Sequence, residues 1–333
     1  MNVKLTVAGK SDVGLVRTGN EDSFRIDQED SLFIVCDGMG GHQAGEVASK
    51  NACEIITYCF LESAEAMGQD PILRIPAQFP PRGDLLVKAI RLTNRSIYIK
   101  SRSRSEYTGM GTTVVAAAFE EDIINVAHVG DSRAYRLTDS ALVQLTTDHS
   151  WVSELKQSGQ FSADEVEKIV GKNVITRALG VNERVEIDYR ADHVKPGEIY
   201  ILCTDGLCGF AGDDEIFEVA KSCNKDVAKI AETLVQLAND HGGQDNVTVI
   251  AIRIDEVEGE SPLAAVKPVT IAVENDDTLL RENQLLEAIN LGAPKTEQVA
   301  VKEPEKRKGK PLFLIFVIFL AIAALAIYFA GNK

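Results

Sequence analysis

The chain has 333 residues, with 50 Asp and Glu against 35 Lys and Arg, so its formal net charge is −15 and its pI is near 4.9. This acidity argues against nucleic-acid binding, which normally needs a basic face. A hydrophobic fraction of 45% and a charged fraction of 26% are typical of a folded protein and exclude a disordered one.

The start of the chain lacks the apolar run of a signal peptide, and Ser11 and Asp12 follow soon after. We therefore expect the bulk of the protein not to be exported. The six cysteines include no C-x-x-C pair, and most lie in apolar stretches. In a reducing compartment they are expected to be core thiols rather than disulfides or zinc ligands.

Up to about Asp255 the sequence alternates between short β-branched runs and helical periodicity. Segments rich in Val, Ile and Phe and bounded by turn residues predict strands at residues 32–36, 112–119, 123–128, 199–203 and 247–254. Apolar residues at helical spacing predict helices over residues 44–60 and 227–238, with a less regular candidate over 83–102. The proline-rich residues 68–83 indicate a surface loop.

Neighbouring strands with only a few turn residues between them favour hairpins over β-α-β crossovers. Residues 120–122, between two of the predicted strands, are such a connection. The fold class predicted is therefore α+β, with largely antiparallel sheets covered by helices, over a single domain of residues 1–254.

Beyond this domain, residues 255–310 lose the apolar periodicity and contain four prolines, which indicates a linker. A short helix around residues 278–289 is expected to be a solvated spacer rather than a partner site. The linker ends in the densest basic cluster of the chain, made of Lys302, Lys306, Arg307, Lys308 and Lys310.

Residues 311–330 contain no charged side chain. Twenty residues at about 1.5 Å each span about 30 Å, the thickness of a hydrocarbon core, so this segment is predicted to be a transmembrane helix. The alternative is a buried C-terminal helix, but such a helix usually keeps one polar stripe. Basic residues before the segment predict a single-pass protein whose folded domain is cytoplasmic, with residues 331–333 as a short tail.

Aspartates occupy unusual places in the folded domain. Asp37, Asp131 and Asp205 each end an apolar strand and are followed by Gly or Ser, whereas Asp245 precedes the strand at residue 247. A strand fixes the position of a side chain, and a glycine beside it permits close approach. Converging carboxylates would repel one another without a cation, and oxygen ligands suit Mg²⁺, Mn²⁺ or Ca²⁺. One Asp-Gly is more often only a turn, so the case for a metal site rests on all four.

Seven motifs follow one another in a fixed order: Arg17-Thr-Gly-Asn-Glu21-Asp22, Asp37-Gly38-Met39-Gly40-Gly41-His42, Gly109-Met-Gly-Thr-Thr113, Val129-Gly-Asp131-Ser-Arg133, Ile175-Thr-Arg-Ala-Leu-Gly180, Thr204-Asp205-Gly-Leu207 and Gly243-Gln-Asp245-Asn246-Val-Thr248. In this order and over about residues 6–254, the chain resembles the bacterial metal-dependent Ser/Thr protein phosphatases of type 2C. The resemblance implies an αββα sandwich. It also implies hydrolysis of phosphoserine and phosphothreonine by a water or hydroxide held between two Mn²⁺ or Mg²⁺ ions, without a phosphoenzyme.

The resemblance also implies a role for each matching residue. Asp37 corresponds to the carboxylate that bridges both metal ions, the Gly38 carbonyl to a ligand of the first ion, and Asp205 and Asp245 to ligands of the second. Asp22, with Glu21 beside it, corresponds to an acid that acts through metal-bound water. Asp131 corresponds to a ligand of a third, weaker metal site. Arg17 corresponds to the guanidinium that holds the substrate phosphate.

One position departs from the pattern. Some members of the family carry His directly after the Asp-Gly as the general acid, where this chain has Met39. His42 and metal-bound water are the alternatives for that role. The segment between Asp148 and Ile175, with Trp151 and a polar helix near residues 163–170, corresponds to the variable flap beside the family's active site, or to a merely solvated insertion.

Other readings are weaker. The sequence has no G-x-S-x-G elbow for a serine hydrolase, and no Cys followed after five residues by Arg, as a cysteine phosphatase needs. The remaining alternative is a catalytically silent pseudophosphatase that binds phosphoproteins. The expected partners are phosphoproteins, a Ser/Thr kinase of eukaryotic type with its substrates, and the cell inner membrane through the C-terminal helix. The catalytic domain is expected to be monomeric.

Overall fold

The computed structural model of the chain describes residues 3–41, 43–62, 79–158, 174–259, 262–273 and 276–288. These residues belong to one compact unit, residues 1–293, and a second unit comprises residues 294–333. The predicted transmembrane segment, residues 311–330, lies outside the described residues. Within the described residues, none of the helices has the length and apolar character needed to cross a membrane.

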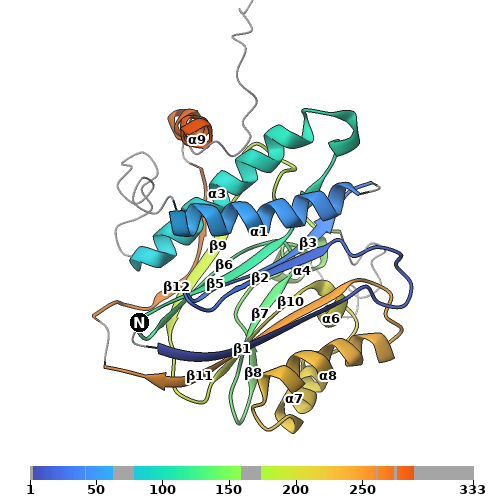
Figure 1. Cartoon of the computed structure of the whole chain (residues 1–333), viewed down its shortest axis with the longest axis vertical. Helices are drawn as coiled ribbons and strands as arrows, with labels where there is room; N and C mark the ends of the chain where they lie inside the picture. The colour runs from blue at the N-terminus through green and yellow to red at the C-terminus, as the bar shows by residue number, and fades with distance from the viewer. Residues whose placement is uncertain are drawn as a thin grey trace, which may run out of the picture. The chain divides into compact units, whose positions relative to one another are not determined.

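Two antiparallel sheets form the centre of the first unit (Figure 1). The first has the order β1 (Val3–Asp12), β11 (Val247–Val257), β10 (Ile199–Cys203), β7 (Arg133–Leu137) and β8 (Leu142–Gln144). The second has the order β12 (Val266–Ile271), β9 (Ile187–His193), β6 (Ile123–Val129), β5 (Val114–Glu120), β3 (Leu32–Met39) and β2 (Asp22–Asp27), with β4 (Gly111–Thr112) paired to β3. The antiparallel pairing expected from the short connections is confirmed.

The helices cover the outer faces of both sheets. In Figure 1, α1 (Ala44–Glu62) and α3 (Pro81–Ser101) lie over the second sheet, while α7 (Asp213–Ser222) and α8 (Val227–Asp240) lie over the first. Shorter helices are η1 (Ser105–Tyr107), α4 (Trp151–Ser158) and α6 (Asp205–Cys208), and α9 (Asp276–Ala288) follows β12. The α+β class with two antiparallel sheets flanked by helices is thus confirmed.

Three apolar layers hold this arrangement together. Alternate residues of the central strands meet between the sheets, where Phe33, Phe119 and Tyr200 pack edge to face with ring centroids 5.8 and 6.0 Å apart. The opposite face of the second sheet packs on α1 and α3, and that of the first sheet packs on α7 and α8. Burial of both sheet faces explains why the central strands are nearly continuous apolar runs.

The predicted strands and helices of the central layers are confirmed, each within a few residues. Weakly patterned strands were not predicted, notably β1, β2, β7 and β9. All six cysteines are free, and five of them are buried, as expected for core thiols. Most of the predicted loop at residues 68–83 lies outside the described residues, and its last three residues belong to the first turn of α3.

The folded unit extends past the predicted boundary at residue 254. Strand β12 pairs with β9 from Val266 to Ile271, and helix α9 packs on α3 through a buried ion pair between Arg91 and Glu282 at 2.9 Å. Leu285 and Leu286 of α9 belong to the core under α3. The helix expected near residues 278–289 is present, but its description as a solvated spacer is corrected, because its inner face is buried.

Candidate metal centre and phosphate site

Two aspartates face each other at the end of the second sheet. Asp22 begins β2 and is the direct cross-strand partner of Asp37 on β3, so their side chains are neighbours. Gly38 follows Asp37 and donates its N–H to the Glu21 carbonyl oxygen at 3.1 Å. A Cβ at Gly38 would lie 2.2 Å from the Gly45 carbonyl oxygen, so only glycine fits there.

Asp22 connects the two sheets. Its Oδ2 accepts hydrogen bonds from Thr248 Oγ1 at 2.7 Å and Thr204 Oγ1 at 2.9 Å, which stand on β11 and directly after β10. Its Oδ1 is buried and has no hydrogen-bond partner among the described residues. Burial raises the pKa of Asp22 to about 7, although the hydrogen bonds from the two threonine hydroxyls act to lower it.

Asp205 and Asp131 approach the pair from the first sheet and from the loop after β6. Burial raises the pKa of Asp37, and the charges of Asp22 and Asp205 raise it further. The carboxyl groups of Asp37 and Asp205 are within hydrogen-bonding reach of each other. Burial, with repulsion from Asp205, raises the pKa of Asp131 to about 7. Four carboxyl groups in this environment cannot all be ionised without a compensating cation.

The donor set fits hard divalent cations. Asp131 Oδ1 and Asp205 Oδ1, like Asp22 Oδ1, are buried oxygens without a hydrogen-bond partner in the described part of the chain. Such oxygens are costly unless a ligand satisfies them. Carboxylate oxygens are the ligands that Mg²⁺ and Mn²⁺ prefer. The sequence-predicted Asp22, Asp37, Asp131 and Asp205 therefore lie close enough for their charges to act on one another.

A threonine joins the two turns that carry Asp37 and Asp131. Thr113 Oγ1 accepts the Asp37 N–H at 3.0 Å and lies 2.7 Å from Ser132 Oγ. The Thr113 N–H donates to the Asp37 carbonyl oxygen at 2.8 Å. These contacts lock the positions of two candidate ligands relative to each other, which metal geometry requires.

Arg17 lies at the exposed rim, on a loop held by Asn246. The Arg17 Nη2 donates to Asp245 Oδ2 at 2.8 Å, and both side chains remain accessible. Asn246 accepts the Glu21 N–H at 2.8 Å and donates to the carbonyl oxygens of Val13 and Gly19, both at 2.9 Å. Arg17 is thus fixed beside a candidate metal ligand, with further guanidinium donors left for an anion.

Glu21 lies next to this loop. Burial raises its pKa, and the positive charge of Arg17 opposes that shift. Its carboxyl group lies against Gly45 at the start of α1, where a Cβ would be 2.7 Å from the Glu21 carboxyl carbon. The first turn of α1 therefore needs glycine to admit this acid. Met39 has no ionisable group, and His42 lies outside the described residues.

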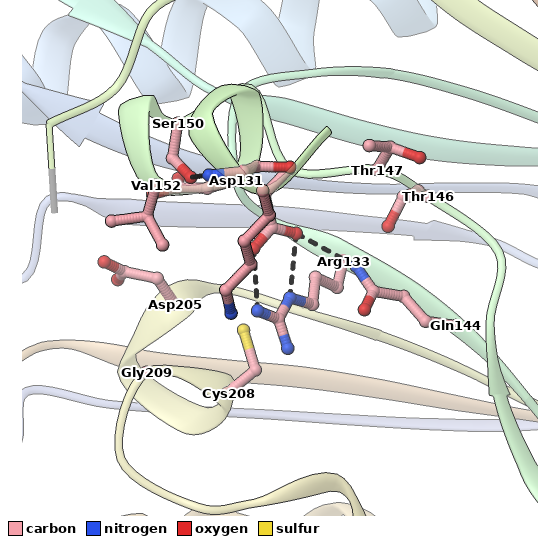
Figure 2. A pocket seen from close by; sticks show the side chains of 13 residues that line it. Asp131, Arg133, Gln144, Thr146, Thr147, Ser150, Val152, Asp205, Cys208 and Gly209 are labelled. Atoms are coloured by element: carbon pink, nitrogen blue, oxygen red, sulfur yellow. Dashed lines mark hydrogen bonds and ion pairs between the residues drawn. The ribbon is translucent and has the colours of Figure 1, made fainter. Parts of the chain in front are cut away.

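A polar pocket of about 520 Å³ opens from Asp131 and Asp205. Figure 2 shows Cys208 and Gly209 of the α6 turn on one side and Gln144, Thr146 and Thr147 on the other. Arg133 lines it but is engaged by Asp148 through two bonds of 2.7 and 2.8 Å. Ser150, Val152, Ser153 and Lys156 bring the start of the predicted flap to this pocket, whereas residues 159–173 lie outside the described residues.

Sequence reasoning missed the polar residues that hold the acids in place. Thr113, Thr204, Asn246 and Thr248 all stand inside motifs recognised from the sequence, and the last three lie within three residues of Asp205 or Asp245. Their place within these motifs was a signal that could have been used to find them. The acidic residues that they hold, however, are 76 to 226 residues away in the chain, and no local pattern shows such a pairing.

The raised pKa values predict a pH-dependent stability of the metal-free protein. Between the unfolded pKa near 4 and the folded pKa of about 7, folded Asp22 and Asp131 hold protons that the unfolded chain releases. Stability therefore falls as pH rises through about 7. With chelator present, we expect the free energy of unfolding to fall by about 1 kcal/mol between pH 6.5 and 8, roughly 2–4 °C in Tm. Calorimetry with excess Mn²⁺ is the control, since bound cations favour the ionised acids; a flat profile in chelator would contradict the prediction.

Comparisons with known proteins show which proteins this chain is similar to. The sequence profile of the family described as Protein phosphatase 2C matches residues 16–245. Serine/threonine phosphatase stp of Listeria monocytogenes is 35% identical over 249 residues, which are 74% of this chain and 94% of that protein. Serine/threonine protein phosphatase PstP of Mycobacterium tuberculosis is 36% identical over 249 residues, covering 74% of this chain but only 44% of PstP.

Solved structures give the same result. The crystal structure of Mycobacterium tuberculosis PstP/Ppp superposes with a TM-score of 0.63 at 34% identity, covering 77% of this chain and 99% of the other. The catalytic domain of PstP in complex with two manganese ions superposes with a TM-score of 0.61 at 34% identity, covering 76% of this chain and 99% of the other.

Proposed function

This chain belongs to the protein phosphatase 2C family and is a metal-dependent protein-serine/threonine phosphatase, and we propose that the carboxylate cluster around Asp37 is its catalytic metal centre. The observation that carries the proposal is a set of buried carboxylate oxygens near Asp37, on Asp22, Asp131 and Asp205, that have no hydrogen-bond partner in the part of the chain that the structure describes. A protein that only bound phosphoproteins would not need them, and the relatives are named as phosphatases, so the pseudophosphatase alternative is set aside.

We propose metal binding for the acidic residues and phosphate binding for Arg17. Asp37, the Gly38 carbonyl, Asp205 and Asp245 would hold two Mn²⁺ or Mg²⁺ ions, with Asp22 nearby, and Asp131 would serve a third, weaker site. When bound, the cations offset the carboxylate charge and activate water for attack on phosphorus.

Arg17 is proposed to bind the phosphate of the substrate. Its guanidinium already donates to Asp245 Oδ2, and its remaining donors can take phosphate oxygens in a fork. Because the side chain is half exposed at the rim, it can meet a phosphorylated segment of a protein without rearrangement of the core. The loop stays in place because Asn246 bonds its backbone on both sides of Arg17.

The test is hydrolysis of a phosphothreonine peptide by the full chain. We expect turnover with Mn²⁺, loss of at least about 100-fold in excess chelator, and recovery on adding Mn²⁺ back. Calorimetric titration of the chelated protein should show two tight Mn²⁺ sites. Turnover that survives chelation would refute the metal-dependent assignment.

A membrane tether is the second part of the proposal. Its support is the uncharged run at residues 311–330 and the basic cluster before it, which favours a catalytic domain on the cytoplasmic side of the inner membrane. The tether would bring the enzyme to phosphoproteins at that surface, including a Ser/Thr kinase of eukaryotic type and its substrates. The catalytic domain itself acts as a monomer in this proposal.

Cell fractionation tests the tether. The full chain should remain with the membrane after washing with carbonate and dissolve in detergent, whereas a chain ending at residue 301 should be in the soluble fraction. Release of the full chain by carbonate would contradict a spanning helix.

A further inference from the structure

A buried pair of histidines contacts the turn that carries Asp131. His128 lies near the end of β6, and His149 lies between β8 and α4. Their rings stack with centroids 4.8 Å apart and planes at 19°, and both side chains are buried. Neither residue belongs to the metal centre described above, and burial lowers the pKa of His128 to about 4, which keeps that ring neutral.

His149 holds Gly130, the residue before Asp131, at two points. The His149 N–H donates to the Gly130 carbonyl oxygen at 2.9 Å, and the Gly130 N–H donates to His149 Nδ1 at 3.1 Å. Gly130 has φ = +109°, and a Cβ there would lie 2.6 Å from Thr113 Cγ2, so the turn depends on glycine and on fixed neighbours. The two bonds fix the backbone from which the Asp131 side chain projects.

The second bond requires one tautomer of His149. Because Nδ1 accepts a hydrogen bond, the ring must carry its proton on Nε2. The Nε2 atom lies 3.2 Å from Asp188 Oδ2, which is an acceptor for that proton. Burial alone would raise the pKa of Asp188, but hydrogen bonds from His149 and Thr270 lower it to about 2, so Asp188 is ionised.

The surroundings of Asp188 fix its orientation. Thr270 Oγ1 donates to Asp188 Oδ1 at 2.7 Å, and Arg177 Nη1 lies 3.3 Å from the same oxygen. Thr270 stands on β12, beyond residues 16–245, which the family profile matches. Strand β12 therefore completes a path of direct contacts from Thr270 through Asp188 and His149 to Gly130.

His128, His149 and Asp188 have ligand atoms close enough together to resemble a metal site. The hydrogen bonds argue against that role. Arg177 Nη1 lies 3.4 Å from His149 Nε2, a permanent positive charge where a cation would have to sit, and His149 Nδ1 is occupied by the Gly130 N–H. The cluster works as a hydrogen-bond network.

We propose that His149, held in its Nε2-protonated tautomer by Asp188, is a positioning residue that sets the Asp131 turn for metal binding. This inference rests on the proposed metal-ligand role of Asp131. It assigns to the histidine and its acid the function that outer hydrogen-bond partners serve in metal centres, where they orient the ligands rather than touch the metal.

Two substitutions at His149 separate positioning from packing. In His149→Asn, the side-chain oxygen can occupy the place of Nδ1 and accept the Gly130 N–H, whereas His149→Gln offers its polar atoms near the place of Nε2. Both remove the ring and its stacking. We expect His149→Gln to weaken the weakest Mn²⁺ site and Mn²⁺-dependent activity by about 10–100-fold, and His149→Asn to stay within about threefold of wild type.

Asp188→Asn tests the tautomer. Arg177 and Thr270 donate to Oδ1, so the asparagine oxygen will remain there and its NH₂ will face His149 Nε2. That arrangement favours the Nδ1-protonated ring, whose N–H would oppose the Gly130 N–H, as in the wrong-tautomer effect known from catalytic triads. The expected loss in the weakest Mn²⁺ site is again about 10–100-fold.

The first readout is the number of bound Mn²⁺ ions, measured by electron paramagnetic resonance, with Asp131→Asn as the benchmark. The second readout is the ¹⁵N spectrum of the His149 ring in the Mg²⁺-loaded wild type. The proposal expects an unprotonated Nδ1 in that spectrum. A protonated Nδ1, or equal Mn²⁺ binding by the Asn and Gln variants of His149, would overturn it. Because the spectrum is recorded on the wild type, it tests the proposal even if the variants do not fold. A wild type without Mn²⁺-dependent turnover would instead refute the proposed function.

His193 provides the matched control. It forms an analogous pair with Asp122 at 2.9 Å, at the opposite end of the β6–β9 ladder, and it is exposed. His193→Gln and His193→Asn should both leave the weakest Mn²⁺ site within about twofold of wild type, because rim pairs contribute little.

Discussion

Asp37→Asn lowers kcat/KM for a phosphothreonine peptide at saturating Mn²⁺ by about 10³-fold or more. The side chain is the direct cross-strand neighbour of Asp22 and lies within hydrogen-bonding reach of Asp205. An amide of the same shape carries no charge and turns one acceptor into a donor, so it cannot hold two cations as a carboxylate does. Loss of several kcal/mol of charge stabilisation corresponds to this factor. Steady-state kinetics and Mn²⁺ calorimetry measure it.

The stability of the same variant in chelator is a second readout, and it is expected not to fall when activity does. The raised pKa of Asp37 shows that its charge is unfavourable in the cation-free fold, so the chelated variant should be at least as stable as the chelated wild type. Asp214→Asn, at an exposed site in the first turn of α7, is the control and should change neither activity nor metal binding. If Asp37→Asn kept activity within tenfold of wild type, the proposed metal centre would be misplaced.

The positions of these acids could be predicted because their strands have an unusual signature. In β3 and after β10, a buried apolar run stops next to an aspartate, at Cys36 before Asp37 and at Thr204 before Asp205. A strand buried on both faces needs such a run, and a charge can follow only where the strand emerges. What the runs could not show was that ends from two different sheets meet, which depended on the family resemblance.

The strands that were missed lack this signature for a physical reason. Strands β1 and β2 lie at sheet edges or carry many partly exposed residues, so their side chains are mixed in polarity. The place of β1 is set by pairing across most of the chain, as between Val3 and Val257. Such long-range pairing leaves no trace in a local window.

Weak apolar periodicity and four prolines predict a linker after residue 254. Pro268, however, lies in β12, which is the edge strand of its sheet, and an edge strand tolerates a residue without an N–H. Helix α9 likewise seemed too polar for a buried face. Its Glu282 is buried because Arg91 on α3 neutralises it, a pairing that spans 191 residues.

That pairing makes Glu282→Gln the substitution with the largest expected effect on stability. The Glu282 Oε1 accepts from Arg91 Nε at 3.0 Å and lies 2.9 Å from Nη2, and the two side chains are only 2% and 6% exposed. Removing the negative charge leaves a buried guanidinium uncompensated, which costs about 3–5 kcal/mol. Thermal unfolding of the Mn²⁺-loaded chain should show a decrease in Tm of roughly 6–20 °C.

Asp276→Asn on the same helix is the matched control, because it breaks an exposed ion pair with Arg184 and should cost no more than about 1 kcal/mol. Replacing both buried partners, as Arg91→Met with Glu282→Leu, should recover most of the loss, since an apolar pair of similar volume often equals a buried ion pair. If Glu282→Gln cost no more than Asp276→Asn, α9 would not be packed on α3 in solution. A large loss that the double variant repairs would instead show that the extension is part of the catalytic fold. The ion pair between Arg91 of α3 and Glu282 of the extension would then hold it in place.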